Sequence, residues 1–156
     1  MRKVIVEELM FIDAFERDEV FSDPYSQSAY LDLETGKVIW VFGEDYDAEM
    51  YAGIDPEENA ALRNQIDAHP ERYLHIPGRG HGEHHDILRD FLDSHWTDDE
   101  ELWTRARNAY SGSIGGWKEE VDNDNVVHAY YDFRDRRIKK LAVEFFRDNA
   151  IQPVWR

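Results

Sequence analysis

The sequence contains no cysteine, and this absence excludes every site that depends on sulfur. Disulfides, thiolate nucleophiles and cysteine-ligated zinc all require a cysteine side chain. A cysteine-free chain also agrees with a reducing compartment. We therefore expect a cytoplasmic protein with no covalent cross-links.

Long apolar runs are missing as well. The apolar stretch at residues 4–6 stops at Glu7 and Glu8, short of the roughly 7–15 residues of a signal peptide core. The longest later run, residues 38–42, is far below the ~18 residues that a membrane span needs. Neither secretion nor membrane insertion is predicted.

Positive charge is scarce relative to negative charge. The chain has 18 Lys plus Arg against 34 Asp plus Glu, which gives a formal net charge of −16. Lys and Arg supply the counterion release that drives nucleic-acid binding, so we expect no direct contact with DNA or RNA. The charge suits a protein partner with a basic surface, or cation binding.

What is present suffices for one folded domain. The 156 residues are 42% hydrophobic and 13% aromatic, and a chain of this length can bury roughly 68–70% of its unfolded surface. No repeat, low-complexity tract or long linker interrupts it. We predict a single domain spanning residues 1–156; the oligomeric state does not follow from the sequence.

The strand signals lie in the first half of the chain. Apolar spacing predicts a helix over residues 6–17, which Ser22-Asp23-Pro24 ends with a loop. Two β-rich runs flank a glycine-containing turn at residues 34–37 and predict a hairpin over about 28–42. A further strand is expected at about 72–77.

Helix signals dominate the second half. Asp55-Pro56 is a typical helix start, Thr97 begins a capping box, and a long last helix is predicted over about 125–149. The glycine cluster at residues 112–118 is interpreted as a helix end and tight connection. Early strands and late helices without regular alternation predict an α+β fold, with a small antiparallel sheet packed against four to six helices.

A histidine cluster is one candidate site. If a helix starts near Gly80, His81 and either His84 or His85 share one helix face at i,i+3 or i,i+4 spacing. Imidazoles at that spacing can bind a divalent transition metal, to which Glu83 or Asp86 could add an oxygen ligand. The segment matches no zinc-hydrolase motif, and the competing interpretation is the polar first turn of a surface helix.

A second candidate lies on the last helix. Arg134 falls on its apolar stripe, where a guanidinium has to reach solvent or meet a carboxylate. It forms either a structural salt bridge or an anchor for an anionic ligand, with Tyr130 and Tyr131 as walls of the pocket.

Several pieces of the sequence recur in one order in a bacterial family. They lie at residues 29–38, 72–77, 87–91, 130–135 and 142–151, and include Tyr-Leu-Asp, Glu-Thr-Gly-Lys-Val, Arg-Tyr-Leu-His-Ile-Pro and Tyr-Tyr-Asp-Phe-Arg-Asp. In this ordered set the chain resembles uncharacterised protein family 0158. The resemblance implies an α+β bacterial protein and carries no assigned activity.

No nucleophile elbow, phosphate loop or thiol nucleophile is present, so no catalytic residue is predicted and we lean against an enzyme. Our leading hypothesis is an acidic, non-enzymatic binding or regulatory protein without a cofactor. The alternative is a small metal-binding protein or metal-dependent hydrolase built on His81, His84 and His85. A lower alternative is a nucleic-acid mimic or immunity-type inhibitor.

Overall fold

The computed structural model describes residues 1–18, 27–43 and 55–156. The loop predicted at residues 22–24 lies outside this part of the chain. The described residues form two compact units. Unit 1 comprises Met1–Arg79 and Ala142–Arg156, and unit 2 comprises Gly80–Leu141.

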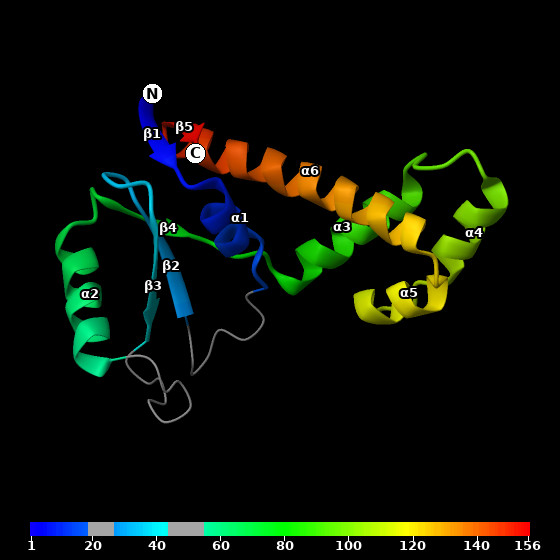
Figure 1. Ribbon diagram of the computed structural model, residues 1–156, viewed down its shortest axis with the longest axis horizontal. Helices are drawn as coiled ribbons and strands as arrows, with labels where there is room; N and C mark the ends of the chain where they lie inside the picture. Colours follow the sequence, from blue (N-terminus) through cyan, green and yellow to red (C-terminus); the bar gives the residue numbers. More distant parts are fainter. Residues whose placement is uncertain (19–26, 44–54) are drawn as a thin grey trace. The chain divides into compact units, whose positions relative to one another are not determined.

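Helices and strands follow in the order drawn in Figure 1. Unit 1 holds β1 (Arg2–Val6), α1 (Glu8–Glu16), β2 (Gln27–Asp32), β3 (Val38–Phe42), α2 (Pro56–Ala68), β4 (Tyr73–Ile76) and β5 (Ile151–Trp155). Unit 2 holds α3 (His81–Asp93), α4 (Glu100–Asn108) and α5 (Ile114–Val121). The long helix α6 (Asp124–Asp148) belongs to unit 2 up to Leu141 and to unit 1 beyond it.

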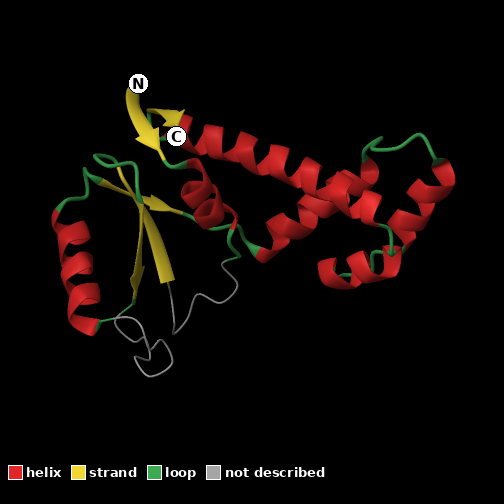
Figure 2. Cartoon of the chain, viewed as in Figure 1, coloured by secondary structure: helices red, strands yellow, loops and turns green. Residues whose placement is uncertain are grey.

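The predicted α+β fold is confirmed, and the described strands all belong to unit 1 (Figure 2). β2 lies between β3 and β4 in an antiparallel three-stranded sheet. The hairpin register pairs Leu31 with Val38, and the turn depends on Gly36, whose φ is +75°. A Cβ added at Gly36 would lie 2.0 Å from the Ile5 carbonyl oxygen, so only glycine fits there.

Helix α2 covers one face of this sheet. Ile66 of α2 packs on Val41 and Tyr73 in a small hydrophobic cluster. Asn59 of α2 ties the end of β3 to that helix, since its side chain accepts from the Phe42 N–H at 2.9 Å and donates to the Phe42 carbonyl at 3.1 Å. Alternation of side chains along the strands thus buries one face beneath α2.

A second, parallel sheet is made by β1 and β5, and no sequence pattern predicted it. Its register pairs Val4 with Pro153 and Ile5 with Val154. Val4 and Val6 of β1 are buried in this unit. Phe11 of α1 is also buried there, and its ring centroid lies 4.6 Å from that of Phe146. The residues near both ends of the sequence are therefore part of the folded core of unit 1.

Unit 2 is helical in its described residues and has an aromatic core. The rings of Trp117 and Tyr130 lie 5.4 Å apart edge to face, and both side chains are buried. Trp117 Nε1 donates to the Ala106 carbonyl at 2.9 Å, so the core also anchors α4 to α5. Residues 112–118 were interpreted as a helix end and tight connection. Gly112 does lie between α4 and α5, but the rest of the segment starts a helix, since Ser113 caps α5 by accepting from the Gly116 N–H at 3.1 Å.

Helix starts follow the expected capping chemistry with one shift. Asp55 caps α2, as predicted, by accepting from the Glu57 N–H at 2.9 Å. The cap of α4 is Asp99 rather than Thr97: Asp99 accepts from the Leu102 N–H at 3.0 Å, while the Thr97 hydroxyl accepts from the Asp99 N–H at 3.2 Å. Within the described residues, no helix combines the length and apolar character needed to cross a bilayer.

Candidate functional site

The predicted histidine cluster lies on the first turns of α3. Gly80 precedes the helix, and its N–H donates to the Glu83 carboxylate at 3.1 Å, which completes the helix start. The helix then places His81 and His85 one turn apart. The Nε2 atoms of these two histidines lie 3.0 Å from each other.

His85 is the buried member of this pair, with 7% of its surface exposed, whereas His81 is exposed. The hydroxyl of Tyr110 is hydrogen-bonded to Nδ1 of His85. His84 is also buried, but the imidazole that contacts His81 through Nε2 is that of His85. Of the two spacings considered, the structure thus brings together the i,i+4 pair.

The oxygen ligands proposed beside these histidines have other partners. Glu83 accepts from the Gly80 N–H, and Asp86 accepts from Arg89 at 3.3 Å. In the described part of the chain, no group of three His, Cys, Asp or Glu side chains could hold a metal ion. The cluster therefore supplies two imidazoles, which is one ligand fewer than a typical catalytic zinc site has.

Tyr130, Tyr131 and Arg134 lie in different environments. Tyr130 is 1% exposed and packs against Phe91 and Trp117, and this burial raises the pKa of its phenol although Arg134 opposes the shift. Tyr131 is half-buried and accepts a hydrogen bond from Lys118 Nζ. Arg134 is half-buried as well. Packing accounts for Tyr130, and an anionic ligand at Arg134 stays a prediction.

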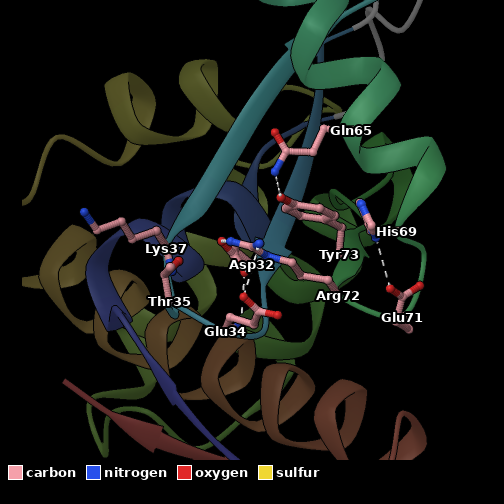
Figure 3. Close-up of polar contacts among 9 residues, drawn as sticks. All are labelled: Asp32, Glu34, Thr35, Lys37, Gln65, His69, Glu71, Arg72 and Tyr73. Atoms are coloured by element: carbon pink, nitrogen blue, oxygen red, sulfur yellow. Dashed lines mark hydrogen bonds and ion pairs between the residues drawn. The ribbon is translucent and has the colours of Figure 1, made fainter.

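Among the described carboxyl groups, Asp32 in unit 1 has the most strongly shifted pKa. Arg72 donates two hydrogen bonds to the Asp32 carboxylate, from Nε at 3.0 Å and from Nη2 at 2.9 Å, and it also forms an ion pair with Glu34 at 3.1 Å (Figure 3). Mainly through these bonds, Arg72 lowers the pKa of Asp32 to about 2. A closed, bidentate pair of this kind holds β2 to the segment before β4, and we assign it a structural role.

A groove between α4 and α5 is a feature of unit 2 that the sequence did not predict. It has a volume of about 680 Å³. Seven residues line it: Glu100, Glu101, Thr104, Arg105, Asn108, Ala109 and Glu120. We call it the α4–α5 groove. Its location depends on α5, which sequence patterns did not reveal.

The charges around the α4–α5 groove are mostly negative. Glu100, Glu101 and Glu120 contribute carboxylates, and all three side chains are exposed. Arg105 is the single cation among the described lining residues, and one of its N–H groups donates to the Val121 carbonyl at 3.1 Å. Part of that guanidinium is therefore committed to holding α4 against the end of α5.

A smaller hollow of about 440 Å³ lies elsewhere in unit 2, between the end of α3 and the middle of α6. It is walled by aromatic side chains, with Asp132 and Arg136 at its polar side. Phe91 and Trp96 stack within this wall at 5.1 Å. Asp132 and Arg136 carry opposite charges, so this pair favours neither an anionic nor a cationic ligand.

Comparison with known proteins gives a family but no activity. A model of the uncharacterised protein family UPF0158 matches residues 1–156. The UPF0158 protein PA5073 of Pseudomonas aeruginosa is 26% identical over 130 residues, which cover 81% of this chain and 76% of the relative. No solved structure matches the chain. The chain belongs to the uncharacterised protein family UPF0158.

Proposed function

We propose that the protein is a non-enzymatic binding protein whose α4–α5 groove receives a basic segment of a protein partner. The observation that carries this proposal is the groove itself, which combines a volume of about 680 Å³ with three carboxylates in its lining. An extended peptide segment with Lys or Arg side chains fits a site of this size and charge.

The charge of the whole chain supports the same partner chemistry. A net charge of −16 attracts a basic partner over long range and raises the association rate at low ionic strength. The groove would then provide the local contacts that fix the partner in place. Thr104 and Asn108 add polar groups that can bond a peptide backbone.

Direct titration tests this proposal. A fluorescein-labelled lysine-rich peptide serves as the probe, and fluorescence anisotropy measures its binding to the intact chain over a series of salt concentrations. The groove variant carries Glu100→Gln, Glu101→Gln and Glu120→Gln. Exposed ion pairs contribute modestly each, so we expect the three changes together to weaken binding by roughly threefold to a hundredfold.

The matched control removes the same charge from elsewhere. Asp13→Asn, Asp67→Asn and Asp148→Asn neutralise three exposed carboxylates of unit 1, which lie outside the groove. If the control weakens peptide binding as much as the groove variant does, the peptide senses only net charge. That result, or the absence of any salt-sensitive binding by the unmodified chain, contradicts the proposal.

A further inference from the structure

Two imidazole nitrogens converge at the start of α3. Nε2 of His81 and Nε2 of His85 are 3.0 Å apart, and the ring centroids are separated by 4.4 Å. One turn of helix fixes this spacing, because side chains at i and i+4 lie on the same face. His81 is exposed, so an ion can reach the pair from solvent.

The spacing is close to that of two ligands on one metal ion. Two nitrogens bound at roughly 2.0–2.1 Å lie about 3.3 Å apart on a tetrahedral ion and about 2.9 Å apart in cis positions on tetragonal Cu²⁺. The two Nε2 atoms would therefore have to move by at most a few tenths of an ångström. Side-chain rotation of the exposed His81 can supply that movement.

Tyr110 prepares the buried histidine for this role. When Nδ1–H of His85 donates to the Tyr110 hydroxyl, Nε2 carries the lone pair that a metal needs. Metal-binding histidines commonly donate their second ring N–H in this way, which fixes both the tautomer and the ring orientation. Tyr110 would act as a positioning residue without touching the ion.

We propose that His81 and His85 form a two-imidazole site for a late first-row divalent metal ion. Neither Glu83 nor Asp86 completes the site, because Glu83 accepts from Gly80 and Asp86 from Arg89. Since the described residues supply no third ligand, we assign the remaining coordination positions to water or to an added ligand. Imidazole ligands favour Cu²⁺ most strongly and give Mg²⁺ and Ca²⁺ little affinity.

Cu²⁺ alone is the probe for this site. Untagged protein is titrated with Cu²⁺ in competition with glycine, and a large excess of Mg²⁺ occupies the exposed carboxylates. We expect one Cu²⁺ per chain, with a paramagnetic resonance spectrum that shows coupling to two imidazole nitrogens. His81→Ala should weaken this binding at least about tenfold and remove one nitrogen coupling, because it deletes half of the chelate.

Two further variants separate chelation from other effects. Tyr110→Phe should weaken Cu²⁺ binding by about tenfold while both nitrogen couplings remain, which is the usual effect of losing a partner behind a ligand. His128→Ala removes an exposed histidine of α6 and should leave binding unchanged. Because His81 is exposed, His81→Ala should retain the fold, and circular dichroism checks this directly.

Equal Cu²⁺ affinity in the unmodified chain and in His81→Ala overturns the proposal, and so does an unmodified chain that binds no Cu²⁺ against Mg²⁺. An equal loss in His128→Ala also overturns it, since it would mean that scattered surface histidines bind the ion. The site is independent of the α4–α5 groove: His81→Ala leaves the carboxylates that bind the peptide probe in place.

Discussion

Replacing Asp32 by Asn tests how much the ion pair between buried Asp32 and half-buried Arg72 stabilises unit 1. Asp32 is 3% exposed, and its two oxygens accept from Arg72 at 3.0 and 2.9 Å. Its Oδ1 also accepts from the Glu34 N–H at 3.0 Å. Asparagine has the same shape but no charge, and its NH₂ group would face a guanidinium donor. We therefore expect Asp32→Asn to destabilise the fold.

The magnitude follows from the pKa of Asp32. Arg72 lowers it from 3.8 to about 2 in the folded protein, and each pKa unit corresponds to about 1.4 kcal/mol. The charge of Asp32 thus contributes at most about 2.5 kcal/mol at neutral pH. The Arg72 side chain is 29% exposed, so solvent screening reduces this to roughly 1–2 kcal/mol.

The sign of the pH dependence is fixed by the direction of the shift. Because the folded-state pKa is lowered, the stabilisation is complete well above the unfolded pKa of 3.8 and is lost as the pH falls toward about 2. At about pH 3, close to half of it should be gone. The difference in unfolding free energy between the unmodified chain and Asp32→Asn should then shrink by up to about 1 kcal/mol.

Urea unfolding followed by circular dichroism at neutral pH and at about pH 3 measures this difference. The control is Glu34→Gln, since the Glu34 side chain also contacts Arg72 but is 60% exposed. That variant should cost much less than Asp32→Asn. An Asp32→Asn effect that is the same at both pH values would refute the electrostatic explanation, and so would an equal cost for Glu34→Gln.

Two further changes probe the core of each unit. Gly36→Ala should destabilise the protein by more than about 2 kcal/mol in a thermal melt, because the φ of Gly36 is +75° and the new Cβ would lie 2.0 Å from the Ile5 carbonyl oxygen. Gly115→Ala is the control: no atom lies within 4 Å of the added Cβ, so this change should not lower stability. Trp117→Phe should cost about 2 kcal/mol in urea unfolding, because it leaves a void and takes the indole donor from the Ala106 carbonyl; a loss below about 0.5 kcal/mol would argue against that bond.

The elements that the sequence predicted well are those whose signals are local. The hairpin around Gly36 needs only neighbouring residues, because the turn and the two strands adjoin in the chain. The same holds for Asp55 and Pro56 at the start of α2, where the cap and the first turn lie within four residues. The long last helix was also predicted, since its apolar stripe repeats over many turns.

Elements that depend on distant partners were missed. The β1–β5 sheet joins Arg2 to Ile151, a pairing that no local pattern can report. Helix α5 was missed because Gly115 and Gly116 suggest a turn, whereas burial of Trp117 against α4 stabilises a helix there. The α4–α5 groove could not be predicted without α5.

Spacing also left the partner of His81 open. Both His84 and His85 lie within one turn of it, and a helix allows contacts at i,i+3 and at i,i+4. The structure selects His85, which is held from its other side by the hydroxyl of Tyr110. Tyr110 is 25 residues away in the chain, so this selection depends on tertiary packing.

Glu120 differs from the other two acids of the α4–α5 groove, because helix stability does not explain its presence. Glu100 and Glu101 line the groove but lie in the first turn of α4, where carboxylates favour the helix dipole. Glu120 lies in the last turn of α5, where the same dipole opposes a negative charge. Glu120→Gln should therefore raise stability slightly, by about 0.3 kcal/mol, while it weakens binding of the lysine-rich peptide. Thermal unfolding and anisotropy of this single variant measure both effects, and opposite signs are expected. If stability falls and peptide binding stays the same, Glu120 stabilises the fold. The residue that most directly indicates a binding role for the groove would then no longer support one.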